Sequence, residues 1–213
     1  MIRKTAADIA AGVLAAVVAV AVPVGGSAAS AAVETTDAKA TNGTLGWGVK
    51  ESFRAYIEGP IADGGIEVSP PAVREEDGTF TWKKGEGRAD VEADTANIKL
   101  RGQVYFYGHD DGTGPTLEVY VDKPRLVIDG ENSMLLADVR SRFGGGLEEY
   151  PDVELVTIDA TGLDLEPNGR GIVKATGLAT ALTADGSVAF AGFYEPGTAF
   201  DPVSFRIKLH IGS

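Results

Sequence analysis

Apolar and polar side chains alternate along much of the chain after residue 80, which is the pattern of half-buried β-strands. Strands are predicted at residues 117–121, 126–128, 135–139, 153–158, 171–182, 188–193 and 205–211. Asp-Gly and Asn-Gly pairs at 111–112, 129–130, 168–169 and 185–186 predict the turns between them. We therefore expect a mostly β fold, an antiparallel β-sandwich or open barrel, with one or two short α-helices near the N-terminus of the domain.

Residues 47–59 depart from this alternation and predict a short amphipathic helix, ended by Gly59-Pro60 and followed by a Gly/Pro-rich loop over residues 60–73. Ser52 and Tyr56 lie four residues apart, so their hydroxyls are neighbours on the apolar face. A polar pair on a burying face needs a partner in the core, in a ligand or in a metal. Helical spacing places one set of residues on the apolar face (Val49, Ser52, Phe53, Tyr56, Ile57) and another on the polar face (Lys50, Glu51, Arg54, Glu58).

The N-terminus has the pattern of a secretory signal peptide over residues 1–31. Arg3 and Lys4 precede an apolar run at 9–22, and Ala29-Ser30-Ala31 offers a cleavage site. Because Pro23 follows that run directly, an uncleaved membrane anchor is the less favoured interpretation, and we expect no stable membrane span. The small, polar segment 32–43 predicts a disordered lead-in to a domain over 44–213, in a protein that is secreted or associated with the cell envelope.

The composition and motifs of the chain argue against several classes of function. The formal net charge is −12, from 31 acidic and 19 basic residues, which argues against nucleic acid and anionic membrane surfaces as partners. The chain has no Cys, so its core must hold without disulfides. Neither a Gly-x-Ser-x-Gly motif nor a dinucleotide-binding fingerprint occurs. We expect a binding protein and not an enzyme.

A second candidate segment is Tyr105-Phe106-Tyr107-Gly108-His109. Strand alternation places Tyr105, Tyr107 and His109 on one face, with Phe106 in the core. This aromatic face would make a flat platform for a ligand, although a bulge at Gly108 would turn His109 to the other side. The other histidine, His210, sits in a terminal strand and is the alternative candidate ligand.

The run LGWGVKESFRAYIEGPIADGGIEV, from Leu45, resembles the opening of the HtaA-type domain, a haem-binding module of corynebacteria and related actinobacteria. Thr79-Phe80-Thr81-Trp82 and the segment 105–109 are further matches. The resemblance implies that Tyr56 binds the iron of one ferric haem b per domain, that His109 hydrogen-bonds to Tyr56 and that Ser52 lines the site. Phe53 and Tyr107 are also expected beside the haem. Phe80 and Trp82 are further candidates along the porphyrin, and Arg54 or Arg101 at the propionates, although such aromatic residues are more often core and such arginines more often surface charges.

A phenol with a pKa of about 10 is a poor ligand at neutral pH, but ferric iron favours the phenolate, and a neighbouring hydrogen-bond donor stabilises it. The resemblance therefore implies a haem-uptake protein. It would capture ferric haem, from solution or from haemoproteins, and relay it to a cell-surface haem receptor or an ABC transporter binding protein. A peroxidase is disfavoured, because no separate distal acid–base pair is identifiable. The alternative is an adhesin or glycan-binding sandwich that uses Tyr105 and Tyr107 without haem.

Overall fold

The structure is a computed structural model that describes residues 37–210, so the predicted signal peptide lies outside it. The chain is mostly β, as predicted. Residues 37–210 form eleven strands, two short α-helices, α1 (Glu51–Ile57) and α2 (Ala184–Ala189), and a 3-10 turn at Gly130–Asn132. Within residues 37–210, no helix is long and apolar enough to cross a membrane. The strands are β1 (Asp37–Trp47), β2 (Gly65–Ser69), β3 (Val73–Arg74), β4 (Phe80–Asp90), β5 (Thr95–Arg101), β6 (Gln103–Asp110), β7 (Pro115–Asp129), β8 (Met134–Phe143), β9 (Glu148–Ile158), β10 (Ile172–Leu182) and β11 (Ala199–His210).

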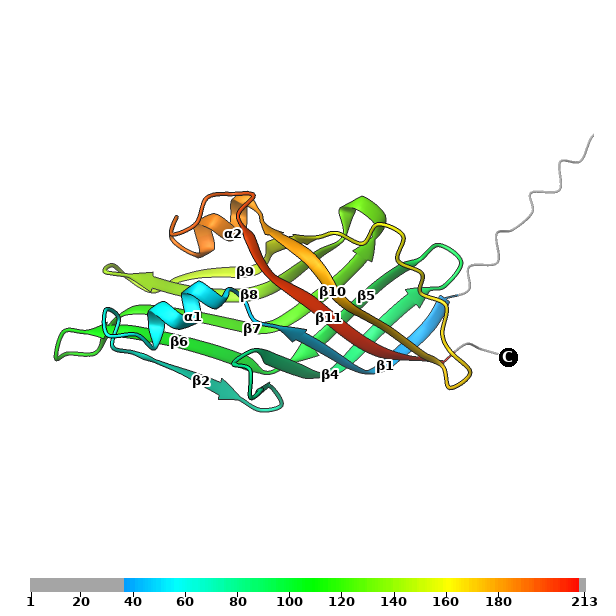
Figure 1. Ribbon diagram of the computed structural model, residues 1–213, viewed down its shortest axis with the longest axis horizontal. Coiled ribbons are helices and arrows are strands. Elements are labelled where there is room, and N and C mark those ends of the chain that lie inside the picture. The colour runs from blue at the N-terminus through cyan, green and yellow to red at the C-terminus, as the bar shows by residue number, and fades with distance from the viewer. Residues whose placement is uncertain (1–36, 211–213) are drawn as a thin grey trace, which may run out of the picture. The chain divides into compact units, whose positions relative to one another are not determined.

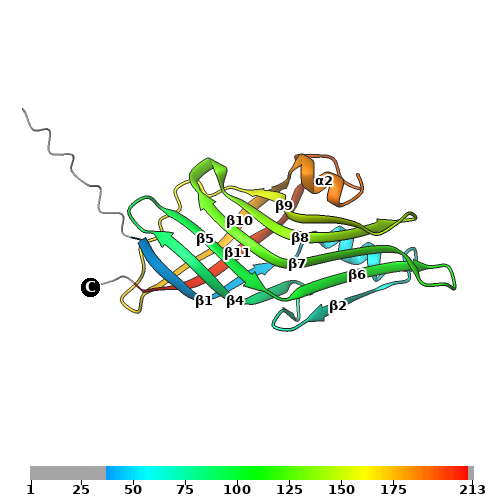
Figure 2. The same ribbon diagram turned by 180° about the vertical axis from the view of Figure 1, so that it is seen from behind.

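All strand pairs are antiparallel, in the order β2-β6-β7-β5-β4-β1-β11-β10-β9-β8. An additional pairing of β7 with β8 closes eight of these strands on themselves, and β6 and β2 extend from β7 (Figures 1 and 2). The long strand β7 changes partner along its length, because its first half pairs with β6 and its second half with β5. The backbone turns from β5 into β6 at Gly102, whose φ of 105° suits glycine.

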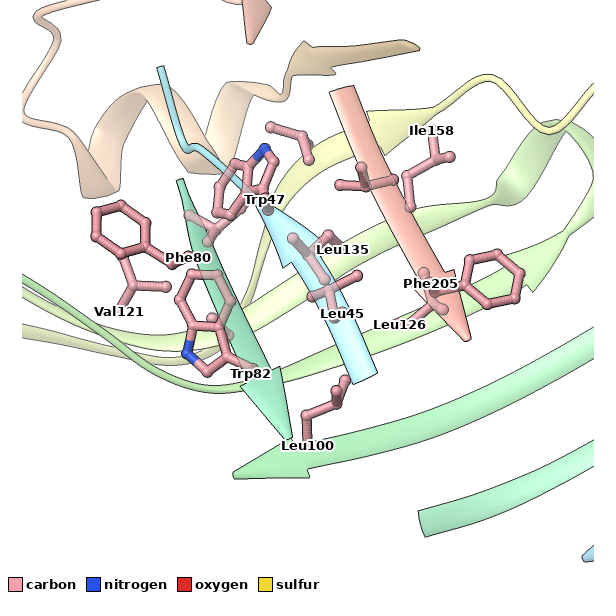
Figure 3. Close-up of a cluster of buried hydrophobic side chains, with 14 of the residues drawn as sticks. Leu45, Trp47, Phe80, Trp82, Leu100, Val121, Leu126, Leu135, Ile158 and Phe205 are labelled. Atoms are coloured by element: carbon pink, nitrogen blue, oxygen red, sulfur yellow. The ribbon is translucent and has the colours of Figure 1, made fainter. Parts of the chain in front are cut away.

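The apolar positions of the strands meet in one buried core (Figure 3). Trp47 and Trp82 lie with ring centroids 6.4 Å apart, and Phe80 meets Phe106 edge-on at 5.6 Å. Phe106 in turn contacts Phe53 of α1 at 5.1 Å, so this cluster supports the helix. The largest fully buried side chains are Trp47, Trp82, Phe53, Phe80, Phe106, Phe190, Leu45, Ile57, Ile98, Leu126, Ile128 and Leu135.

The disordered lead-in predicted for residues 32–43 is wrong from Asp37 onward, where β1 begins. Small, polar composition suggested disorder, but here small residues allow close packing. Ala38 and Ala40 are fully buried, and a Cβ on Gly43 would meet the backbone of Gly85 in β4. The small side chains at these positions allow β1 to pack closely between β4 and β11.

Two other local predictions are wrong. The apolar run 188–193 is not a strand, because α2 covers 184–189 and the rest forms a loop. Thr183 starts this helix, and its hydroxyl accepts a hydrogen bond from the Gly186 N–H at 2.8 Å. The predicted loop 60–73 contains β2, which pairs with β6, and the first residue of β3.

Candidate functional site

Helix α1 packs against β2 and β6 (Figures 1 and 2). Phe53 is 1% exposed and packs on Phe106 at 5.1 Å and on Phe190 at 5.7 Å. Phe53 is therefore a core residue beneath the helix and not a wall of an open site, and the same holds for Phe80 and Trp82. Ser52 is exposed and Tyr56 is half-buried, so the two hydroxyls lie on the flank of the helix.

The N-terminus of α1 has no side-chain cap of its own, and Asp201 of β11 holds this end of the helix instead. One carboxylate oxygen of Asp201 accepts the Glu51 N–H at 2.9 Å, and the other accepts Arg54 Nη1 at 2.5 Å. Arg54 also donates to the Gly48 carbonyl and is only 8% exposed. The prediction that Arg54 lies on the polar face is therefore wrong, and its guanidinium is paired with Asp201. A Cβ on Gly48 would overlap the Asp201 and Arg54 side chains, which explains the glycine after Trp47.

His109 leaves the alternation of β6, because its φ of 55° is left-handed. Its N–H donates to the Ala62 carbonyl at 2.7 Å, and its carbonyl accepts a hydrogen bond from the Thr116 hydroxyl at 2.9 Å. The backbone of His109 is therefore held at both its N–H and its carbonyl. The imidazole turns toward α1, where Nε2 lies 2.5 Å from the Tyr56 hydroxyl. The structure thus brings together Tyr56 and His109, which are far apart in the sequence.

Tyr107 does not share the face of His109, contrary to the expectation from alternation. Its ring tilts against Tyr105 at 5.2 Å, and Tyr105 stacks on Tyr120 of β7 at 4.1 Å. A Cβ on Gly65 would meet the Tyr107 ring, so this ring covers a glycine of β2. Tyr107 therefore belongs to a tyrosine array on the outer face of the sheet, and the left-handed turn at His109 separates it from Tyr56.

The outer tyrosine array (Tyr105, Tyr107 and Tyr120) is anchored on Glu118. One Glu118 oxygen accepts both the Tyr105 hydroxyl at 2.8 Å and the Tyr120 hydroxyl at 2.9 Å, and the other lies 3.0 Å from Arg142 Nε. Burial raises the pKa of Tyr105, and its hydrogen bonds with Tyr120 and Glu118 raise it further. Burial is also the main cause of the raised pKa of Tyr120. These phenols therefore stay neutral, and their hydroxyls are already occupied.

Phe193 and Phe143 are site residues that the sequence did not reveal. Phe193 is 48% exposed, and its ring lies 6.2 Å from the Tyr56 ring and 4.8 Å from the Phe143 ring. A cavity of about 420 Å³ borders Phe143 and is lined by glycines of two loops. The run Gly144-Gly145-Gly146 was the signal available in the sequence. The cavity lining comprises Ser141, Phe143, Gly145, Gly146, Glu148, Tyr150, Ser187, Val188, Ala191 and Gly192.

The two remaining candidates lie elsewhere. His210 bonds to the Thr41 hydroxyl at 2.8 Å at the far end of β11, about 30 Å along the strand from Asp201. Arg101, exposed at the end of β5, lines a different cavity together with Lys99 and Lys123. Residues 37–210 contain no group of three or more His, Cys, Asp or Glu side chains that could hold a metal ion. Among the described residues, we therefore take the Tyr56–His109 pair as the candidate functional site.

Comparison with known proteins identifies the family. The family model for HtaA, described as Htaa, matches residues 42–206. The chain belongs to the HtaA family. No curated protein sequence matches it.

Solved structures of the family superpose on this HtaA-family chain. The C-terminal domain of HtaA from Corynebacterium glutamicum is 29% identical, with a TM-score of 0.72 over 81% of this chain and 99% of that domain. The N-terminal domain of the same protein is 26% identical, with a TM-score of 0.67 over 82% of this chain and 99% of that domain. The haem-binding protein HtaB from the same organism is 27% identical, with a TM-score of 0.66 over 82% of this chain and 96% of HtaB.

Proposed function

We propose that this protein binds ferric haem, with Tyr56 as the ligand to the iron and His109 as the hydrogen-bond partner of that tyrosine. The observation that carries the proposal is the 2.5 Å contact between the Tyr56 hydroxyl and His109 Nε2. Membership of the HtaA family and the similarity to the haem-binding protein HtaB support it.

The residues around Tyr56 fit a porphyrin. The Tyr56 hydroxyl lies at a half-buried position, and its imidazole partner is able to donate a hydrogen bond to a phenolate. Ferric iron, when bound, supplies the positive charge that favours the phenolate form. Phe193 is half-exposed beside Tyr56, an unfavourable position for a phenylalanine in water, and a porphyrin plane would cover it. Ser52, exposed one turn before Tyr56, would lie at the edge of the ligand.

The wider role follows from the same ligand. Phenolate is a hard anionic donor that favours Fe(III), which suits a carrier that holds haem without activating oxygen. We expect one haem b per domain, captured outside the membrane after removal of residues 1–31 and passed to a surface receptor or a transporter binding protein. Haem is therefore cargo, and the protein acts by reversible ligand exchange and not as an enzyme.

The glycan-binding alternative has little support in the geometry. It required open tyrosine rings on the outer face of β6, but the Tyr105 ring is stacked on Tyr120 and both hydroxyls are bound to Glu118. Sugar recognition needs accessible ring faces and free polar groups. We therefore retain haem as the proposed ligand.

The test is an absorbance titration of the full chain with ferric haem, alongside Tyr56→Ala and His210→Ala. We expect a saturable one-to-one spectrum of the ferric phenolate type, abolished by Tyr56→Ala and kept by His210→Ala. Loss of the spectrum in the His210 variant alone would overturn the assignment of the ligand. Absence of saturable binding by the unmodified chain would overturn the function itself.

A further inference from the structure

Asp201 lies at the contact between β11 and α1, the helix that carries Tyr56. It is the third residue of β11, and the loop before that strand carries Phe193. Its carboxylate contacts α1 at the Glu51 N–H and at Arg54, although the chain separates Asp201 from Glu51 by 150 residues. One side chain therefore links the helix that carries Tyr56 to the strand that follows the Phe193 loop.

The backbone of Asp201 is fixed as firmly as its side chain. Its N–H donates to the Val49 carbonyl at 2.9 Å, and its carbonyl accepts Trp47 Nε1 at 2.9 Å and the Thr180 hydroxyl at 3.0 Å. Val49 is fully buried with a φ of 65°, a conformation that a β-branched residue adopts only where its surroundings impose it. The segment that leads into α1 is thus held in an unfavourable conformation by contacts that include Asp201.

We propose that Asp201 is a positioning residue for haem binding, which keeps α1 and the Phe193 loop in the relation that places the Tyr56 hydroxyl against His109. This inference rests on the proposed function. The helix has only seven residues and would not be stable on its own, so the orientation of Tyr56 depends on how its ends are held. The Arg54–Asp201 ion pair has side chains that are only 10% and 21% exposed, so solvent screens it less than a surface pair.

The other end of α1 provides a matched control. Glu58, directly after the helix, forms a two-bonded ion pair with Arg74 of β3 at 2.6 and 2.8 Å. This pair also ties the helix to a strand, but its side chains are 40% and 31% exposed, and neither residue belongs to the strand that follows the Phe193 loop. Loss of an ion pair as such is therefore separable from loss of the link at Asp201.

The experiment compares Asp201→Asn with Glu58→Gln in the full chain. Asparagine keeps the size of Asp201 and an acceptor for the Glu51 N–H, but removes the charge that faces Arg54. We measure the ferric haem spectrum and the rate of haem loss to excess apomyoglobin. We expect Asp201→Asn to alter the phenolate band and raise the rate of loss at least about tenfold, because small displacements of a ligating group have large effects. Glu58→Gln should change that rate by less than about twofold.

A second pair of variants covers the case in which Asp201→Asn fails to fold. Arg54→Lys keeps a cation for Asp201, whereas Arg54→Met removes it, so the rate of haem loss should rise with Met and return toward the original value with Lys. Spectra and rates that match those of Glu58→Gln in every folded variant would overturn the proposal. If the unmodified chain shows a phenolate band that Tyr56→Ala removes, such a result defeats only the role of Asp201. If the unmodified chain lacks that band, the proposed function and this inference fall together.

Discussion

The two faces of β6 use aromatic residues in opposite ways. On the outer face, Tyr105 and Tyr107 belong to a tyrosine array in which the Tyr105 and Tyr120 hydroxyls donate to the carboxylate of Glu118. On the inner face, His109 meets a single phenol, Tyr56, beside a half-exposed phenylalanine. The difference shows that the number of aromatic residues on a surface does not identify a site; the partners of their polar groups do.

The two hydrogen-bond partners explain this difference chemically. Glu118 as a carboxylate only accepts hydrogen bonds, so it holds phenols in their neutral form, in line with the raised pKa of Tyr105 and Tyr120. His109 is able to donate or to accept, so it tolerates Tyr56 as phenol or as phenolate. A phenol that must lose its proton before it binds iron therefore suits the inner face and not the outer one.

The largest effect on stability is expected from Glu118→Ala. The change removes the shared partner of two tyrosine hydroxyls and of Arg142 at a position that is almost fully buried. We expect a loss of about 2–4 kcal/mol in the free energy of unfolding, measured by urea denaturation. Haem affinity of the folded variant should stay within about twofold, because the network lies on the face opposite Tyr56. Glu118→Gln, which keeps an acceptor, should lose less; a large fall in haem affinity in either folded variant would remove the distinction between the faces.

His109→Ala tests the inner face with a smaller expected effect. The substitution removes the hydrogen bond to Tyr56 and leaves the candidate ligand itself in place. Removal of a group that supports a metal ligand typically lowers affinity about 10- to 100-fold, and we expect that range in a ferric haem titration. His109→Gln, whose amide is able to donate, should recover part of the loss. An affinity that is unchanged in the alanine variant would contradict the role of the imidazole.

The smallest effect is expected at Glu58. The hydrogen bonds from Arg74 lower the pKa of Glu58 below its ordinary value of 4.5, so the charged form is favoured in the folded protein. Its contribution to stability is therefore present above the unfolded-state value and is lost as the pH falls through the folded-state value. We expect Glu58→Gln to lower the free energy of unfolding by less than about 1 kcal/mol at pH 7, since the pair is exposed. The stabilities of the two proteins should converge as the pH falls below the folded-state pKa of Glu58; a difference that persists at such acidic pH would mean that packing, and not charge, is involved.

The comparison also separates what pattern in the sequence predicts from what it does not. Alternation predicted most of the strands after residue 80, although not β1 or β2, and helical spacing predicted α1 with Tyr56 on it, because both patterns are local consequences of backbone geometry. Alternation placed His109 with Tyr107, since the rule assumes extended backbone and His109 is left-handed. The cause of that turn is a hydrogen bond to Ala62 in a distant loop, which no local pattern contains.

Long-range partners account for the remaining errors in the site. Arg54 was predicted on the polar face because its partner, Asp201, lies at the other end of the sequence. Phe193 was predicted in a strand because an apolar run does not distinguish a strand from a short helix followed by an exposed loop. Asp201 and Phe193 were not identified from the sequence, because their place near α1 depends on the sheet that brings β11 alongside the segment before this helix.

The central claim is tested most directly by one pair of ferric haem titrations, with Tyr56→Phe and Tyr107→Phe. Each variant loses a single hydroxyl and keeps its ring, so packing is preserved while the chemistry changes. Our account predicts that Tyr56→Phe loses the ferric phenolate band and most of the affinity, whereas Tyr107→Phe keeps both. A Tyr56→Phe variant with an unaltered phenolate band, or a Tyr107→Phe variant without one, would contradict the account.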